Sequence, residues 1–192
     1  DLNGGRGSVR EALLILKRSY LIEIYPRRGA VVAEMSVQQI KSLFDTSNLV
    51  LGEMVHRTAE CWRQTDSDMM NQLLVNLSDQ VRQGDIEQFY DQVFSFLQRT
   101  NQIVGNAYVA DMFENLLPAL RRSYFLTLNT SRRELQEAFE LFRPVIDAIL
   151  IRKGEQAFNF RQVFGGLLQN LVLFSLPGKK QTGRAGAQLP RR

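Results

Sequence analysis

Cysteine and histidine are almost absent from this sequence, and their scarcity excludes several kinds of site. The single cysteine, Cys61, rules out an internal disulfide and fits a reducing compartment, and we expect it to be a buried, unreactive residue on a helix. The single histidine, His56, completes no convincing Ser/His/Asp or Cys/His arrangement, so we expect it to be structural or exposed. Because a P-loop and a GxGxxG motif are also missing, the sequence indicates that the protein is not an enzyme.

Long apolar runs are missing as well. No run approaches the ~18 to 20 apolar residues of a membrane span, and no segment has the pattern of a signal peptide. The chain of 192 residues, 44% of them hydrophobic, is long enough for one sizeable core and a small second unit. We therefore expect a cytoplasmic protein without a membrane partner.

Positive charge is concentrated at the two ends of the chain. Residues 1–33 hold six Lys/Arg and three Asp/Glu, and residues 178–192 hold five Lys/Arg and no acid. Between them, residues 34–177 hold thirteen basic and seventeen acidic residues. An electropositive N-terminal unit on a mildly acidic body predicts a polyanionic partner for the first unit alone.

A short helix followed by a β-hairpin is predicted near the start of the chain. Ser8 and Glu11 have the spacing of a capping box, and apolar residues follow at three- and four-residue steps: Val9, Leu13, Leu16 and Tyr20. The alternating run 21–25 predicts a strand, residues 26–29 a turn, and residues 30–33 the return strand. A helix and a hairpin with two arginines at its tip are typical of the end of a winged helix-turn-helix.

The remaining sequence predicts helices only. Ser36 with Gln39 and Ser131 with Glu134 are expected capping boxes. Short connections without a strand pattern predict an antiparallel all-α bundle, with helices at about 36–62, 67–83, 86–102, 106–128, 131–153 and 157–176. The expected division is a partial winged-helix DNA-binding unit, an all-helical effector-binding and dimerisation domain and a basic disordered tail, over residues 1–35, 36–177 and 178–192.

The run from Arg6 to Leu13, Leu16 and the hairpin over 22–32 resemble the recognition helix and wing of GntR-family transcription regulators. The helical remainder is similar to the ligand-sensing domain of the FadR-like branch, and the resemblance covers roughly residues 4–176. It implies a homodimeric repressor or activator whose affinity for double-stranded DNA changes when a small molecule binds. A complete winged helix-turn-helix has two helices before the recognition helix, so either the sequence lacks its N-terminal part, which we favour, or this unit is degenerate.

The DNA contacts expected from this arrangement come from the helix start and the hairpin tip. The helix would lie in a major groove and the tip would reach the backbone or the minor groove. The residues expected there are Arg6, Ser8, Arg10, Arg27, Arg28 and Gly29. The alternative is a ligand-binding or scaffold helical module without DNA binding.

The resemblance also bears on metal binding. Metal-binding members of this branch use an Asp and three His, and place an Arg on the first bundle helix to meet an effector carboxylate. Here Asp91 stands at the acid position, but the three histidine positions hold Ser95, Phe142 and Phe164, and Ser47 stands at the arginine position. We therefore expect no metal and no other cofactor, and we expect a small carboxylate to find neither a cation nor a guanidinium.

The pocket predicted from these replacements is apolar with a few polar groups. Its expected lining is Ser47, Asp91, Phe94, Ser95, Val109, Phe113, Phe142, Ile146 and Phe164. Such a pocket would take an apolar or amphipathic effector, for example a fatty acid derivative or an aromatic compound. The alternative is that the phenylalanines only fill the core and that no effector binds.

Overall fold

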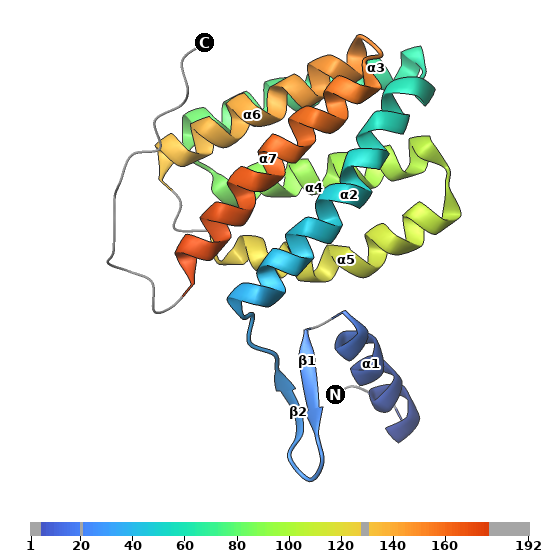
Figure 1. Cartoon of the computed structure of the whole chain (residues 1–192), viewed down its shortest axis with the longest axis vertical. Helices are drawn as coiled ribbons and strands as arrows, with labels where there is room; N and C mark the ends of the chain where they lie inside the picture. The colour runs from blue at the N-terminus through green and yellow to red at the C-terminus, as the bar shows by residue number, and fades with distance from the viewer. Residues whose placement is uncertain (1–4, 20, 128–130, 177–192) are drawn as a thin grey trace.

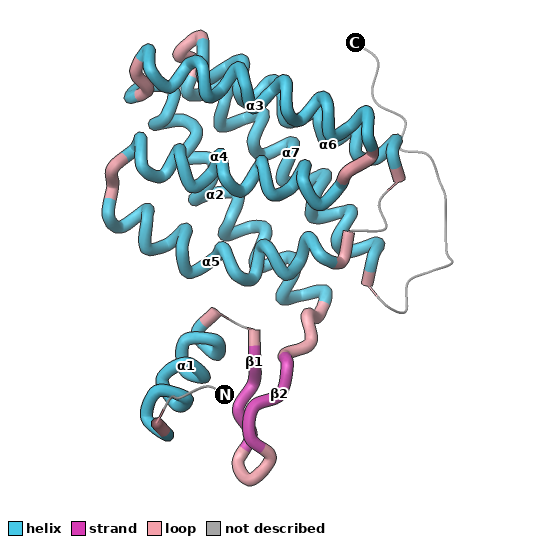
Figure 2. The backbone as a smooth tube through the Cα atoms, turned by 180° about the vertical axis from the view of Figure 1, so that it is seen from behind, coloured by secondary structure: helices cyan, strands magenta, loops and turns pink. Residues whose placement is uncertain are grey.

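A computed structural model describes residues 5–19, 21–127 and 131–176 of the chain. A helix and a β-hairpin lie together at one end of a bundle of six helices, and the hairpin leads directly into the first bundle helix (Figures 1 and 2). This architecture confirms the mainly α fold that the sequence predicts. The Tyr20 side chain and the tail from residue 178 onward lie outside the described residues.

The N-terminal helix α1, Arg6–Arg18, starts earlier than predicted. Its N-cap is Gly5, which supplies no side-chain cap, and the Ser8 N–H already donates to the Gly5 carbonyl at 2.9 Å. The predicted capping role of Ser8 is therefore wrong, because Ser8 is the third residue of the helix. Within the described residues the apolar face of α1 is largely uncovered, with Val9 49% and Ile15 60% exposed.

The hairpin follows the predicted pattern closely. Strands β1 (Ile22–Tyr25) and β2 (Gly29–Val32) pair antiparallel, with Tyr25 opposite Gly29. The turn closes through a hydrogen bond from the Arg28 N–H to the Tyr25 carbonyl at 3.3 Å. Gly29 has the positive φ expected of it, 79°, but Arg27 also has a positive φ of 65°, which the sequence did not predict.

The six bundle helices enclose one continuous core. Helix α2 runs alongside α7, and α7 also packs on α6 (Figure 1). Less extensive interfaces join α2 to α4 and α5, and α3 to α4 and α6. The bounds of the bundle helices are α2 Val37–Cys61, α3 Gln64–Gln83, α4 Ile86–Val104, α5 Ala107–Phe125, α6 Arg132–Leu150 and α7 Gly154–Ser175.

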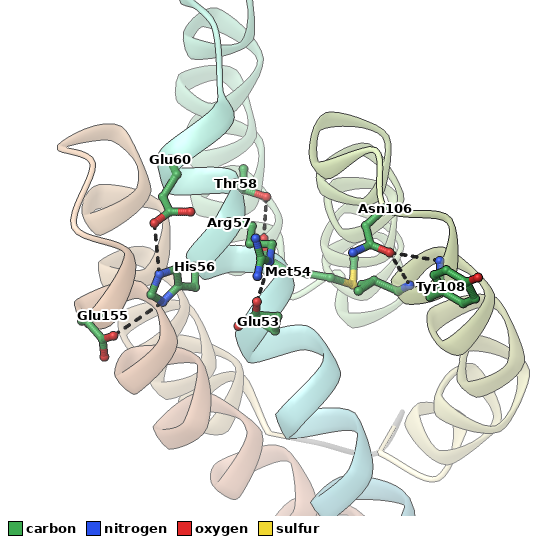
Figure 3. Close-up of polar contacts among 10 residues, drawn as sticks. Glu53, Met54, His56, Arg57, Thr58, Glu60, Asn106, Tyr108 and Glu155 are labelled. Carbon is green, nitrogen blue, oxygen red and sulfur yellow. Dashed lines mark hydrogen bonds and ion pairs between the residues drawn. The ribbon is translucent and has the colours of Figure 1, made fainter.

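Helix ends agree with the sequence where a cap defines them. The capping boxes at Ser36 and Ser131 are confirmed, and Asn106 Oδ1 accepts the Tyr108 N–H at 3.0 Å at the start of α5 (Figure 3). The prediction fails at the start of α3, which begins three residues before the expected Ser67. Gly154 begins α7 instead of ending the preceding helix.

Two further expectations concern Cys61 and the absence of a membrane-spanning segment. Cys61 is exposed at the end of α2, so its predicted burial is wrong. Among the described helices none combines the length and apolar character that crossing a bilayer requires.

Candidate functional site

The N-terminal unit presents its polar residues to solvent. Ser8 and Arg10 are exposed on α1, and Arg27, Arg28 and Gly29 are exposed at the hairpin tip. The side chain of Arg6 lies outside the described residues. Because α1 packs beside β1, the helix and the arginine-bearing turn belong to one small surface that projects from the bundle (Figure 2).

The backbone at the hairpin tip is strained at Arg27. In a turn with proline at its second position and a positive φ at its third, glycine or asparagine is the usual third residue. Here Arg27 takes that position at φ 65°, which costs about 1 kcal/mol relative to glycine. A residue kept in an unfavourable conformation supports a role for its exposed side chain.

Arg122 joins the bundle to the base of the hairpin. From the last turn of α5 its guanidinium donates to the Leu21 carbonyl at 3.5 Å and to the Ala33 carbonyl. Leu21 and Ala33 flank the two strands and are themselves bonded, with the Ala33 N–H donating to the Leu21 carbonyl at 3.0 Å. One bundle side chain therefore fixes the open end of the hairpin, where β1 begins and β2 ends.

The predicted pocket residues divide into two aromatic clusters and an exposed pair. The first cluster is interior: the ring of Phe142 lies 5.8 Å from that of Phe96 and 5.1 Å from that of Phe164. Phe113 and Ile146 are also fully buried, whereas Val109 is partly buried. These residues pack as a core, with ring geometries typical of aromatic side chains that contact one another.

The second cluster centres on Tyr124 of α5. Its ring stacks on Tyr90 at 4.7 Å and meets the edge of Phe94 at 4.9 Å and of Phe44 at 6.4 Å. Burial raises the pKa of the Tyr124 hydroxyl to about 12, with a smaller lowering effect from Arg161 nearby. Burial also raises the pKa of the Tyr90 hydroxyl, with a smaller lowering effect from the Thr127 side chain beside it.

A cavity of about 170 Å³ opens between α4 and α5 beside the second cluster. We refer to it as the α4/α5 cavity; its walls are the rings of Tyr90, Phe94, Tyr124 and Phe125 and the charged residues Glu87, Asp91 and Arg121. Asp91 and Arg121 form an ion pair at 3.3 Å, and the guanidinium lies 4.8 Å above the Phe94 ring. The cavity therefore has aromatic walls and a charged rim, and on that rim Asp91 is already paired with Arg121.

The positions that hold metal ligands in the resembled family do not converge here. Asp91 is half exposed in its pair with Arg121, and Ser95 is exposed on the outside of α4. Phe142 and Phe164 instead pack together in the interior. Within the described ranges no cluster of three His, Cys, Asp or Glu side chains could hold a metal ion.

Ser47 and His56, the other two polar residues considered from the sequence, are both engaged. Ser47 is fully buried, and its hydroxyl donates to the Leu43 carbonyl of its own helix at 2.6 Å. His56 lies partly exposed between α2 and α7, with Nε2 3.4 Å from Glu60 and Nδ1 3.9 Å from Glu155 (Figure 3). Neither residue faces the α4/α5 cavity.

Arg161 of α7 is the polar residue that sequence reasoning missed. It is only 2% exposed, its Nη1 donates to Asn48 Oδ1 at 3.1 Å, and its guanidinium lies 5.7 Å from the Phe164 ring. The expectation that a small carboxylate would find no guanidinium in this bundle stays a prediction, because Arg161 lines neither of the two cavities described here. A signal was present, since Arg161 lies on the apolar stripe of its helix with Ala157, Phe164 and Leu168.

A second cavity, of about 390 Å³, lies at the other end of α4. It borders the exposed Cys61 and contains the ion pair of Arg99 with the buried Asp66 at 3.3 Å. Asp66 Oδ2 also accepts the Arg63 N–H at 2.9 Å at the start of α3. Asp66 and Arg99 are therefore paired with each other, and Arg63 is a second, exposed arginine in the lining of this cavity.

Comparison with known proteins places the bundle in a family. The FCD domain model matches residues 42–160, more than half of the chain. The gluconate operon transcriptional repressors of Bacillus subtilis (strain 168) and Bacillus licheniformis are 24% and 22% identical to it over 147 residues. The match takes in 77% of this chain but 59% of each repressor, so the chain spans well under two thirds of these relatives.

Solved structures support the same fold. The chain is similar to E. coli McbR/YncC with a TM-score of 0.73 and 19% identity, over 86% of this chain and 82% of that one. Streptococcus agalactiae GntR gives a TM-score of 0.58 at 15% identity, over 88% and 84%. The named relatives are regulators, which agrees with the expectation that the protein is not an enzyme. From the FCD match and these relatives, the chain belongs to the FCD-domain family, the FadR-like branch of the GntR regulators.

Proposed function

We propose that this protein is a DNA-binding transcriptional regulator of the repressor type, acting as a cytoplasmic homodimer on a double-stranded operator. The observation that carries the proposal is the exposed surface shared by α1 and the arginine-bearing hairpin tip, attached to an FCD bundle. Residues 1–35 would be the DNA-binding unit and residues 36–177 the effector-binding and dimerisation domain. The gluconate operon repressors among its relatives support this direction of control.

We further propose that a small effector binds without a metal in the aromatic part of the bundle and changes operator affinity. The last turns of α5 contact both the α4/α5 cavity and the base of the hairpin. Arg121 and Tyr124 line the cavity, and Arg122 donates hydrogen bonds to the hairpin base. An effector that moves this end of α5 would move the carbonyls that Arg122 holds. The effector would thereby reorient the hairpin against DNA.

The first prediction concerns the DNA contacts. In the full-length protein, Arg10→Ala is expected to weaken operator binding ~10- to 100-fold if its side chain reaches a base edge. Changing Arg27 and Arg28 together to Ala should weaken binding to all DNA sequences. The slope of log affinity against log salt concentration should become shallower, by the amount expected for the loss of about two phosphate contacts. The measurement is fluorescence anisotropy with a duplex selected from a randomised library, at several salt concentrations.

The matched control is Arg133→Ala, which removes an exposed arginine paired with Glu137 on the bundle. Its operator affinity should equal that of the wild type. Light scattering on the same samples should give twice the chain mass. If the wild type selects no duplex and its weak binding is insensitive to the three arginines, the protein is a ligand-binding or scaffold module without DNA binding.

The second prediction concerns the junction. Arg122→Met should weaken operator binding about tenfold, because the hairpin then loses both of its hydrogen bonds from α5 and samples other orientations. Thermal unfolding of the bundle should change little, since Arg122 is only half buried. Anisotropy and circular dichroism on the same preparation separate the two effects.

Arg132→Met is the control for this change. Arg132 also donates to a backbone carbonyl, that of Gln83 at 3.3 Å, but this hydrogen bond joins α6 to α3 and does not involve the hairpin. Equal losses of operator affinity in the two variants would mean that Arg122 acts through general stability rather than through the hairpin.

A further inference from the structure

The larger of the two cavities described above lies far from the hairpin and has two arginines in its lining. We refer to it as the α3/α4 cavity, and its polar lining is Cys61, Arg63, Thr65, Asp66, Arg99 and Gln102. Helix α2 runs from the hairpin to this end of the bundle (Figure 1), and its 25 residues span about 37 Å. The volume of about 390 Å³ falls within the ~300–1,000 Å³ of most ligand pockets, so a small organic molecule fits.

Arg99 of α4 is held in place by a buried acid. Its Nη2 donates to Asp66 Oδ1 at 3.3 Å, and its Nη1 donates to Gln102 Oε1 at 3.1 Å. Asp66 is only 6% exposed, and its Oδ2 accepts the Arg63 N–H at 2.9 Å, so the carboxylate is itself fixed. Among the described residues Arg99 thus uses two of the five N–H donors of a guanidinium. The other donors are oriented by these contacts and are available to a ligand.

Arg63 supplies a charge that no acid balances. Its side chain is exposed in the cavity wall, and none of the ion pairs between described residues includes it. The lining therefore holds two guanidinium groups and one carboxylate, an excess of one positive charge. Thr65 and Asp66 belong to the first turn of α3, so the positive end of that helix lies at the same place. The cavity is an electropositive site on a mildly acidic bundle.

The backbone beside Arg63 is fixed from the connection between α6 and α7. Arg152 donates to the Glu60 carbonyl at 3.1 Å and to the Trp62 carbonyl at 2.9 Å, and its guanidinium lies 4.5 Å from the Trp62 ring. Trp62 in turn donates from Nε1 to the Ile149 carbonyl at 2.9 Å. Arg152 holds these contacts at a positive φ of 59°, which is unfavourable for a residue with a side chain. This wall of the cavity is therefore preorganised, which lowers the cost of binding.

We propose that the α3/α4 cavity binds a small phosphate monoester. At neutral pH such a group carries a charge of about −1.5 to −2 and three acceptor oxygens, so it can accept from Arg63 and Arg99 at once. A carboxylate has one charge and two oxygens, which a single guanidinium already satisfies. The two arginines come from different elements, the connection before α3 and α4 itself, and this arrangement suits a tetrahedral group better than a planar one.

The rest of the lining favours a polar body on the ester. Thr65 offers a hydroxyl and Gln102 an amide, whereas Ile103 is the single aliphatic side chain in the lining. A cavity of about 390 Å³ also has more room than a bare phosphate ion fills. We therefore expect a sugar phosphate or a polyol phosphate. Inorganic phosphate should bind more weakly, because it makes only the contacts with the arginines.

The test compares sugars and polyols with and without their phosphate. In phosphate-free buffer of low ionic strength, calorimetry should show binding of glucose 6-phosphate or glycerol 3-phosphate to the wild-type protein. Inorganic phosphate and gluconate should bind at least ~10-fold more weakly, and glucose and glycerol should not bind at millimolar concentration. The proposal is overturned if neither ester binds at millimolar concentration, or if the parent sugar, gluconate or inorganic phosphate binds as tightly as the ester.

Arg63→Gln is the variant that tests the site. Arg63 is exposed and has no ion pair among the described residues, so the variant should fold, and it should bind the ester ~10-fold more weakly or worse. Arg82→Gln is the matched control on the same helix, because Arg82 is exposed, pairs with Asp79 and lines neither cavity. Its affinity for the ester should equal that of the wild type. Unchanged affinity in Arg63→Gln would contradict the proposal.

Cys61 reports whether the ester occupies this cavity. It is the only cysteine of the chain, and it is exposed in the lining, so the neutral reagent N-ethylmaleimide should alkylate it alone. A saturating concentration of the ester should slow this alkylation several-fold in the wild-type protein, and the same concentration should protect Arg63→Gln less. Binding of the ester without any protection of Cys61 would place the ligand elsewhere and overturn the proposal.

The hairpin arginines provide a second control on location, because they are the groups that we propose bind DNA phosphates. Changing Arg27 and Arg28 together to Ala should leave the affinity for the ester unchanged. A loss of ester binding in that variant would assign the ester to the DNA-binding surface instead.

These outcomes are separable from those of the proposed function. Ester binding is measured without DNA, and operator binding is measured without the ester. A protein that binds its operator but no phosphate ester keeps the proposed function and loses the α3/α4 site. A protein that binds the ester through Arg63 but no DNA keeps the site and loses the regulator.

Discussion

Phe142→Ala is expected to lower the free energy of unfolding by about 3–5 kcal/mol. Phe142 is 1% exposed and touches Phe96 and Phe164, so its removal leaves a cavity that the rigid helices around it cannot close. Urea unfolding followed by circular dichroism at a helical wavelength gives the difference. The result also shows whether the Phe142 ring packs in the core or lines a ligand pocket, because a side chain that lines an open pocket has fewer contacts to lose.

Phe174→Ala is the matched control on α7, where the ring is 71% exposed. Its effect should stay within about 0.5 kcal/mol of the wild type. A loss below about 1 kcal/mol for Phe142→Ala would show that the interior around Phe142 is loosely filled. In that case the effector site would extend into the cluster of Phe96, Phe142 and Phe164 rather than stop at the α4/α5 cavity.

The fold was predictable wherever a local signal defines the chain. Ser36 and Ser131 each carry a capping box, and Pro26 with Gly29 defines the hairpin turn. The start of α1 was not predictable, because the sequence around Ser8 is typical of a helix N-cap although the helix has already begun at Arg6. A residue that favours an N-cap can also lie inside a helix that begins before it. The pattern of side chains alone does not show which of the two occurs.

The candidate site was predictable only in part. Phe113, Phe142, Ile146 and Phe164 were predicted to lie inside the bundle as pocket residues, and all four are buried. The family resemblance grouped them with Asp91 and Ser95, which lie on the exposed side of α4. Single positions carried over from a family pattern say nothing about helix rotation, which depends on the whole apolar stripe.

Arg161 escaped prediction for a different reason. A long charged side chain is almost always placed at the surface, because full burial without a partner is costly. Its location on the stripe of Ala157, Phe164 and Leu168 therefore looked like an interruption rather than a site. What overrides the usual rule is the close approach of α2 and α7, which brings Asn48 to the guanidinium.

That close approach depends on Gly165, and two adjacent glycines of α7 should respond to alanine in opposite ways. At Gly165 a Cβ would lie 1.9 Å from Asn48 Oδ1 and 2.6 Å from Arg161 Nη1, whereas at Gly166 it would meet nothing within 4 Å. Gly165→Ala should therefore destabilise the protein by about 1–3 kcal/mol. Gly166→Ala should stabilise it by about 0.5–1 kcal/mol through helix propensity alone. Urea unfolding of the two variants gives both signs.

The cost at Gly165 has a specific origin, and a double variant isolates it. Relief of the clash requires the Asn48 side chain to rotate, which removes the only hydrogen-bond acceptor that Arg161 has among the described residues. In an Asn48→Ala background the new Cβ no longer meets that oxygen, so Gly165→Ala should cost clearly less there than in the wild type. Equal costs in both backgrounds would mean that the clash is with Arg161 Nη1 rather than with Asn48.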